Sequence, residues 1–212
     1  MQNVQNIDIV RLAGNKIDLC ILRTDEEAIK AYTKWINDES INMYVCKNQQ
    51  LCQYNIEADW VEQKTLDNEY IFNIVEKNDN RLLVGICDIN FNFKFGRCAS
   101  LGILIGEEEG RNKGYGTEAI SMLIKYCFEE LNMHRVGISV IADNERALRC
   151  YKKCGFIECG TKHDMCYYKG KWHDVIDLEI LEDTYFSDSY IAPKTDIEFD
   201  DLELCEDDGY AE

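Results

Sequence analysis

The sequence contains a single proline and no long apolar run, and each shortage limits the structure. With only Pro193 among 212 residues, Gly, Asn and Asp must form most of the turns. No stretch approaches the roughly 18 apolar residues of a membrane span, and the first residues lack the basic-then-apolar order of a secretory signal. We therefore expect a cytoplasmic protein with no membrane segment.

No two of the eleven cysteines form a C-x-x-C pair, and their number is odd. Zinc sites and small disulfide frameworks use paired, regularly spaced cysteines. Several of the cysteines fall within apolar segments, where a thiol packs as a small hydrophobic group: Cys20, Cys87, Cys98 and Cys127. The sequence therefore predicts no bound metal and no disulfide scaffold.

Basic residues are scarce, 23 against 40 acids, which gives a formal net charge of −17. This charge disfavours nucleic acid as a partner and mildly favours a cationic one. Residues 182–212 contain twelve acids and one lysine, which leaves a charge of −6 for residues 1–181. We therefore expect a folded domain over 1–181 and an acidic C-terminal tail over 182–212, either disordered or docked through its aromatic residues.

The periodicity of apolar residues predicts a mixed α/β protein. The strongest helical pattern covers residues 114–131, and Thr24 is expected to cap an earlier helix over 25–37. Further helices are expected at 55–66 and 144–154, and strands at 10–12, 17–22, 70–75, 81–93, 98–105, 136–141, 156–168 and 172–181. This order predicts an α+β mixed sheet with helices on its faces.

Residues 101–119, LGILIGEEEGRNKGYGTEA, have the features of an anion-binding loop. A strand leads into glycines at 106, 110, 114 and 116 and cations at 111 and 113, directly before the strong helix. Free N–H groups at a helix start, the helix dipole and the small size of glycine together favour a phosphate there.

Two phosphate-binding motifs compete for this loop. GYGTEA matches the dinucleotide fingerprint G-x-G-x-x-A, but Gly114 stands nine positions after Ile105, whereas that fold turns almost immediately after its strand. A Walker A loop needs Lys and then Ser or Thr after its last glycine, and here Thr117 follows Gly116 directly. Neither motif explains the loop well.

The run RNKGYG at 111–116 resembles the R/Q-x-x-G-x-G/A signature of the GNAT N-acetyltransferases. Outside the loop, the chain is similar to the ribosomal-protein and spermidine acetyltransferase branch at Gly102-Ile103, Asn144, Ala147, Tyr151, Gly155-Phe156 and residues 170–174. The resemblance covers roughly residues 8–181. It implies the GNAT fold, a mostly antiparallel mixed sheet that splays at the acetyl-CoA site, with helices on both faces.

The resemblance also implies roles for individual residues. Acetyl-CoA would enter between the strands at 101–105 and 136–141, with its pantetheine arm paired to the backbone of Ile103, Leu104 and Ile105. Its diphosphate would be held by Arg111, Asn112, Lys113, Gly114, Tyr115, Gly116 and Thr117. Asn144 would touch the cofactor or serve only as a helix cap.

Tyr151 is the expected general acid. A phenol with a pKa near ~10 stays protonated at neutral pH and can donate a proton to the leaving thiolate. Its spacing in the helix also fits an ordinary core aromatic residue, so both interpretations stay open.

The general base is unassigned, because Ser100 occupies the position where many relatives have a glutamate. The alternatives are a water chain or one of the side chains Glu76, Asp88, Glu107, His134, His163 and His173. The acceptor pocket is expected in residues 35–60, with walls from Tyr44, Tyr54 and Trp60. Trp172 and Asp174 are expected to be structural, in a hairpin at the acceptor side or at a homodimer interface.

The resemblance thus implies an enzyme that transfers acetyl from acetyl-CoA to a primary amine in a ternary complex. The amine could be a protein N-terminus, a polyamine or an amino sugar. One alternative is a CoA-binding sensor or interaction module without catalysis, which Tyr151 argues against and Ser100 argues for. A dinucleotide-dependent oxidoreductase is a third hypothesis.

Overall fold

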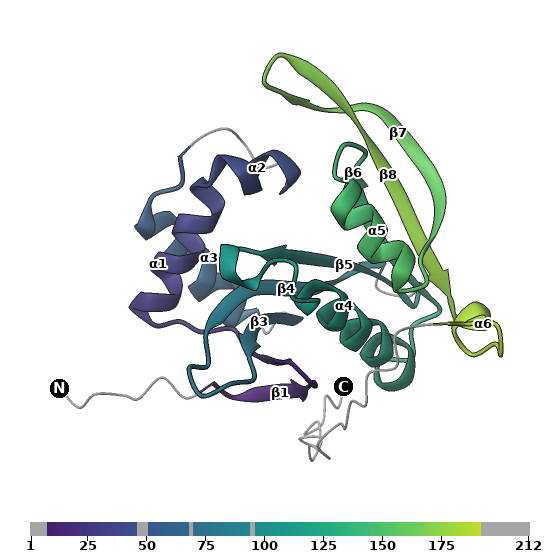
Figure 1. Cartoon of the computed structure of the whole chain (residues 1–212), viewed down its shortest axis with the longest axis horizontal. Helices are drawn as coiled ribbons and strands as arrows, with labels where there is room; N and C mark the ends of the chain where they lie inside the picture. The colour runs from purple at the N-terminus through teal and green to yellow at the C-terminus, as the bar shows by residue number, and fades with distance from the viewer. Residues whose placement is uncertain (1–7, 46–50, 68–69, 94–95, 192–212) are drawn as a thin grey trace, which may run out of the picture.

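The computed structural model describes residues 8–45, 51–67, 70–93 and 96–191. An eight-stranded sheet forms its centre, in the order β1-β2-β3-β4-β5-β6-β8-β7 (Figure 1). The strands are β1 (Val10–Ala13), β2 (Ile17–Ile21), β3 (Tyr70–Glu76), β4 (Leu83–Phe93), β5 (Cys98–Ile105), β6 (Arg135–Ile141), β7 (Ile157–Tyr168) and β8 (Lys171–Leu181). Neighbouring strands are antiparallel except β5 and β6, so the predicted mixed sheet is confirmed.

Helices cover both faces of the sheet (Figure 1). They are α1 (Glu26–Asn37), α2 (Glu39–Val45), α3 (Tyr54–Leu66), α4 (Tyr115–Lys125), α5 (Glu145–Lys153) and α6 (Glu182–Tyr185). Leu104 of β5 packs with the core of α1 and α3, whereas Leu101 belongs to the core that includes α4 and α5. Because successive strand residues point to opposite faces, α1 and α3 lie across the sheet from α4 and α5. Neither α2 nor α6 was predicted from the sequence.

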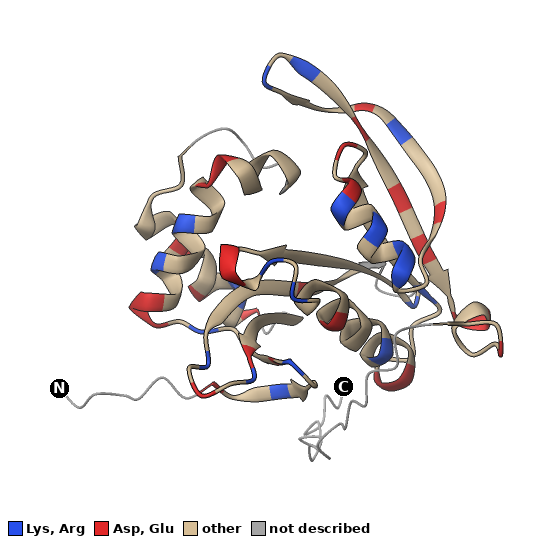
Figure 2. Cartoon of the chain, in the orientation of Figure 1, with Lys and Arg blue, Asp and Glu red and all other residues tan. Residues whose placement is uncertain are grey.

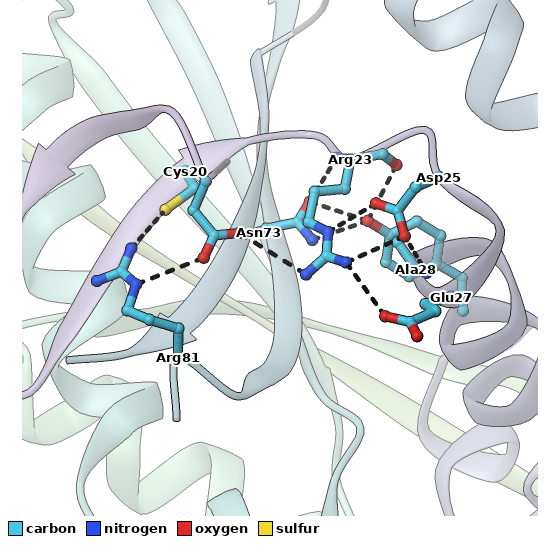
Figure 3. Close-up of polar contacts among 9 residues, drawn as sticks. Cys20, Arg23, Asp25, Glu27, Ala28, Asn73 and Arg81 are labelled. Atoms are coloured by element: carbon cyan, nitrogen blue, oxygen red, sulfur yellow. Dashed lines mark hydrogen bonds and ion pairs between the residues drawn. The ribbon is translucent and has the colours of Figure 1, made fainter. Parts of the chain in front are cut away.

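The N-terminus of α1 is capped by Asp25 and not by Thr24, which corrects the sequence prediction. The Asp25 carboxylate accepts a hydrogen bond from the Ala28 N–H at 3.1 Å. It also accepts one from Arg23 Nε at 2.8 Å (Figure 3). A charged cap complements the helix dipole and can bind Arg23, which a threonine hydroxyl cannot do as strongly.

A polar network joins β2 and the segment that leads from it into α1 to β3 and to the loop after β3 (Figure 3). Asn73 Oδ1 accepts from the Arg23 backbone N–H at 3.1 Å and from the Tyr32 hydroxyl at 3.0 Å. Arg81 pairs with the buried carboxylate of Asp18. Buried polar groups need such partners, and this network ties the start of α1 to the sheet.

The sheet splays apart between β5 and β6. The two strands pair only from Cys98↔Arg135 to Ser100↔Gly137, whereas β6 stays paired with β8 as far as Ile141↔Val175. Beyond Ser100, the main chain of β5 therefore has no strand partner on its β6 side in the described structure. This gap is the splay that the resemblance implied.

The first residues after β8 dock onto the domain. The Tyr185 ring stacks on Phe128 with centroids 4.6 Å apart, and the Tyr190 hydroxyl donates to the Cys154 carbonyl at 2.9 Å. Part of the expected tail thus packs near α4 and α5, and the boundary after residue 181 remains our proposal. Residues 192–212, including Phe199, lie outside the described residues.

The cysteines largely behave as expected. Cys20, Cys87 and Cys127 are buried and Cys98 is half-buried, and burial raises the pKa of Cys127 to about 12. Cys166 on β7 is disulfide-bonded, which the sequence did not predict. In the described ranges, every helix is too short or too polar to cross a bilayer.

Candidate active site

A cavity of about 900 Å³ opens where β5 and β6 part. This volume lies within the range of small-molecule and cofactor sites. Its walls come from β5, the far half of β6, the loop before α4, the exposed side of α5 and helix α2: residues 40–41, 44, 101–105, 110–112, 114–117, 138–140, 143–147, 149–151 and 153. Ile103, Leu104 and Ile105 are among them, at the places that the sequence analysis expected.

The loop before α4 presents its backbone to the cavity. Gly114 is the N-cap of α4 and has a φ of 88°, a left-handed conformation that glycine adopts at little cost. Six of the seven residues predicted for this loop line the cavity: Arg111, Asn112, Gly114, Tyr115, Gly116 and Thr117. The unpaired N–H groups of the first helical turn thus lie at the cavity wall, where they favour an anion.

Lys113 is the exception, because its side chain turns away from the cavity. Its Nζ donates to Glu76 Oε1 at 2.7 Å. The Tyr115 hydroxyl donates to the same oxygen at 2.5 Å, and Asn78 Nδ2 donates to Glu76 Oε2 at 2.8 Å. The buried carboxylate neutralises Lys113, and the Lys113 side chain is not among the residues that line the cavity. That residue 113 helps to hold the cofactor stays a prediction, which concerns its backbone N–H.

Glu76 is therefore committed to the loop. The hydrogen bond from Lys113, followed by that from Tyr115, holds the pKa of Glu76 below its ordinary value. A carboxylate with three donors is a poor acceptor for a further proton. This geometry argues against Glu76 as the general base.

The turn between β1 and β2 braces the start of α4 from the other side. The Glu118 carboxylate accepts the backbone N–H groups of Asn15 and Lys16 at 2.6 and 2.8 Å. Lys16 Nζ donates to the Lys113 carbonyl at 3.2 Å. The loop is thus held by contacts from β3 and from the β1–β2 turn.

Basic side chains gather around the cavity. Arg111 Nε is buried without a hydrogen-bond partner in the described structure. Three cations of α5, Arg146, Arg149 and Lys153, also line the cavity, and Figure 2 shows the basic residues repeated along this helix. The unpaired Nε of Arg111 and the cations of α5 are suited to bind a ligand that carries several phosphate groups, such as coenzyme A. The sequence analysis missed the α5 cations, although their spacing of three and four residues was visible.

Tyr151 of α5 lines the cavity with only 7% of its surface exposed. Its ring packs against Phe156 at a centroid distance of 6.2 Å. Burial raises the pKa of the Tyr151 hydroxyl, and electrostatic repulsion from the Cys150 and Cys154 side chains raises it further. The hydroxyl therefore stays protonated near neutral pH, as a proton donor must.

Cys150 and Asn144 complete the α5 wall. Cys150 Sγ lies 3.3 Å from Thr117 Oγ1, and a hydrogen bond from the Cys154 thiol lowers its pKa. The sequence gave no sign of this contact. Asn144 caps α5 by accepting the Ala147 N–H at 3.1 Å, and it also lines the cavity, so both of its expected roles fit the geometry.

The other candidate bases lie in different settings. Glu107 accepts from Lys34 Nζ and from Trp35 Nε1, both at 2.8 Å, and so ties the end of β5 to α1. The three histidines lie outside the cavity lining, each beside a carboxylate: His134 at Glu182, His163 at Asp174 and His173 at Asp143. Asp88 lies against Gly102, which lines the cavity.

Helix α2 supplies the cavity wall that was expected from residues 35–60. Tyr44 lines the cavity as expected, together with Ser40 and Ile41. Tyr54 and Trp60 do not: Tyr54 is 41% exposed at the start of α3, and Trp60 packs half-buried against the core of α1 and α3. The unpredicted helix α2 takes their place at the cavity.

The β7–β8 hairpin reaches α2 at its tip. Lys169 Nζ lies 2.6 Å from Glu39 Oε1, and the Tyr168 hydroxyl donates to the same oxygen at 3.4 Å. Trp172 is 54% exposed beside Tyr167. Asp174 accepts the Asp164 N–H at 2.9 Å, a contact within the hairpin that agrees with a structural role.

Comparison with known proteins agrees with this architecture. The model of the acetyltransferase (GNAT) domain matches residues 18–157. A spermidine N(1)-acetyltransferase of Vibrio cholerae is 28% identical over 149 residues, which are 64% of this chain and 85% of that protein. A putative ribosomal N-acetyltransferase of Bacillus subtilis is 35% identical over 101 residues, 47% of this chain and 54% of that protein.

A solved structure shares the fold. The crystal structure of spermidine N-acetyltransferase from Vibrio cholerae in complex with CoA and spermine matches with a TM-score of 0.71 and 22% identity, over 81% of this chain and 99% of that one. The family model covers well over half of the chain. The protein therefore belongs to the GNAT acetyltransferase family.

Proposed function

We propose that this protein transfers the acetyl group of acetyl-CoA to a cationic primary amine in a ternary complex. The observation that carries the proposal is the cavity at the splay of β5 and β6, where a helix N-terminus, an orphaned arginine donor and a buried tyrosine meet. Membership of the family accounts for acetyl transfer. The residues around the cavity suggest how it proceeds.

The cofactor would be held along one continuous path. Backbone N–H groups of residues 111–117 and the free Nε of Arg111 would bind the diphosphate, and the cations of α5 would bind the remaining phosphate charge. The pantetheine arm would pair with the β5 main chain at residues 101–105, where β6 has moved away. A backbone N–H near Ile103 or Leu104 would then stabilise the oxyanion that forms during transfer.

The reaction needs an attack by the amine on the thioester and the departure of the CoA thiolate. The neutral amine nitrogen attacks the thioester carbon, a C–N bond forms, and the C–S bond breaks as the tetrahedral oxyanion collapses. The Tyr151 hydroxyl, kept protonated by burial, donates its proton to the leaving sulfur. The nitrogen loses a proton, and the tyrosine is reprotonated from solvent.

We infer a cationic acceptor from the net charge of −17, although residues 182–212 carry −11 of it. Two similar proteins are named for spermidine and for ribosomal acetylation, so a polyamine or a basic protein N-terminus is the acceptor class that we propose. A charge-steered acceptor loses rate as salt rises. Equal rates at low and high salt would remove the charge argument.

The test is an amine panel with acetyl-CoA and the purified chain, read by mass detection of products. We expect acetylated spermidine or an acetylated basic N-terminal peptide, with one thiol released for each product. Calorimetric titration with CoA should show binding to the same protein. CoA binding without any acetylated product would instead favour a sensor or interaction module.

A further inference from the structure

We propose that Asp88 is the general base that takes the proton from the acceptor amine, an inference that rests on the proposed function. Asp88, Glu76 and Glu107 were the carboxylates open for this role. Glu76 is held by loop residues and Glu107 by Lys34 and Trp35. Asp88 is not itself among the lining residues, but its carboxylate lies against Gly102, which is one of them.

Strand register places Asp88 on the acceptor side of β5. Asp88 pairs with Gly102, and Asn90 pairs with Ser100. Paired residues share a face, and Ile86 and Leu104, one step along the same face, pack with α1 and α3. Asp88 therefore points to the side of α1, α2 and α3, where Ile41 of α2 belongs to the same core and also lines the cavity.

Tyr151 lies on the other side of the same strand. It belongs to the core formed with α4 and α5, as do the β5 residues that alternate with Gly102. A base and an acid on opposite sides of the thioester match the reaction, because the amine arrives at one side of the carbonyl carbon and the thiolate leaves from another. This opposition favours Asp88 for the role of base.

Gly102 brings the Asp88 carboxylate to the cavity wall. A Cβ built on Gly102 would lie 2.5 Å from Asp88 Oδ1 and 3.0 Å from its carboxyl carbon, far closer than non-bonded contact allows. The carboxylate thus rests on the bare main chain of β5, beside Ile103, where the thioester would lie. Asn90 Nδ2 donates to Asp88 Oδ1 at 2.8 Å and orients the group.

Two further carboxylates on this face belong to β8 and have basic partners. Asp177 of β8 lies 2.7 Å from Lys162, and Glu179 lies 2.6 Å from Arg135. The β3 and β5 partners of Asp88 are Ile71 and Gly102, which carry no charge. On the opposite face, burial and then the Asp88 charge raise the pKa of the Cys87 thiol.

The ammonium of the acceptor gives one proton to the Asp88 carboxylate, directly or across one water, and so frees the lone pair that attacks the thioester carbon. The C–S electrons leave with sulfur, which receives the Tyr151 proton. The second N–H proton leaves the tetrahedral intermediate to solvent, and Asp88 releases its own proton to solvent before the next turnover.

The experiment compares Asp88→Asn with Asp88→Glu, and with Asp177→Asn as a matched control on the same face. At pH 7 we expect Asp88→Asn to lower kcat by about 10²-fold, with the KM for acetyl-CoA unchanged. The deficit should shrink as the pH rises toward 9.5, because the deprotonated fraction of an amine with a pKa near ~10 grows and replaces the base. Asp88→Glu should recover part of the rate, and Asp177→Asn should stay within about threefold of wild type.

Two further variants distinguish the loss of the base from a general folding defect. Gly102→Ala should reproduce the loss by displacing the carboxylate, and Ser100→Glu added to Asp88→Asn should restore activity from the same face. The base role is overturned if Asp88→Asn keeps its kcat, if its deficit is the same at every pH, or if only the amine KM rises. An inactive wild type that acetylates no amine would overturn the proposed function itself, which separates the two failures.

Discussion

Replacing Glu76 with glutamine should weaken cofactor binding although Glu76 lies outside the cavity. Its carboxylate accepts from Lys113, Tyr115 and Asn78, and is 5% exposed. Glutamine keeps one acceptor oxygen but places an NH₂ group against donors. The substitution therefore loses at least one charge-assisted hydrogen bond and leaves the Lys113 charge unbalanced at the point where the loop enters α4.

The size of the effect follows from the bonds that are lost. A hydrogen bond to a charged group contributes about 1.5–3 kcal/mol. If the loop must regain its arrangement when the cofactor binds, a cost of about 2 kcal/mol corresponds to a Kd for CoA that is roughly 30-fold higher. The kcat at saturating acetyl-CoA should change little, because Glu76 touches no reacting atom.

The same carboxylate should contribute to stability with a defined pH dependence. The bonds from Lys113 and then Tyr115 hold its folded pKa below the ordinary value of 4.5. A depressed carboxyl pKa stabilises the fold above the unfolded value, and the contribution is lost as the pH falls through the folded pKa. The stability difference between wild type and Glu76→Gln should therefore be full above about pH 5 and shrink in more acidic solution.

Calorimetric titration with CoA and chemical denaturation of each variant provide the assay. Glu118→Gln is the matched control, since this buried glutamate also accepts two N–H groups, but from the β1–β2 turn. It should lose stability with a smaller change in CoA affinity. Unchanged CoA affinity in Glu76→Gln, or an equal loss in both variants, would refute the role of Glu76 in ordering the loop.

Three further predictions concern the catalytic acid, the α5 cations and the α1 cap. Tyr151→Phe should lower kcat by about 10²-fold with CoA affinity nearly intact, and unchanged steady-state turnover would discredit the acid role. Arg146→Ala should raise the Kd for CoA and flatten its salt dependence, which titrations at two ionic strengths would measure; an unchanged salt slope would count against a phosphate contact. Asp25→Ala should cost about 1–2 kcal/mol of unfolding free energy and Thr24→Ala much less, and denaturation showing the reverse order would contradict the assigned cap.

The sequence predicted the sheet and the loop well, because both have strong local signals. Apolar alternation identified the strands, and four glycines with two cations before an apolar helix predicted an anion site in the loop that the structure places at the cavity. The cap was misplaced by one residue, since Thr24 and Asp25 are both good cap residues and only the contact with Arg23 decides between them. The splay itself came from the family resemblance and not from the periodicity.

The parts that were missed depend on contacts between distant segments. Helix α2 is only seven residues long and has too few turns to show a period, so the wall formed by Ser40 and Ile41 could not be predicted. Lys113 belongs to the loop motif, but Glu76, 37 positions earlier, binds it away from the cavity. The placement of Asp88 likewise depends on the β4–β5 register, which one sequence does not reveal.

The central claim is that the N-terminus of α4 binds the diphosphate of acetyl-CoA while β5 carries its pantetheine arm. A crystal structure of this chain with CoA tests it most directly. We predict the diphosphate oxygens within hydrogen-bond distance of backbone N–H groups in residues 111–117, and the thiol end between β5 and Tyr151. A cofactor bound elsewhere on the protein, or a diphosphate that does not touch this loop, would contradict the account.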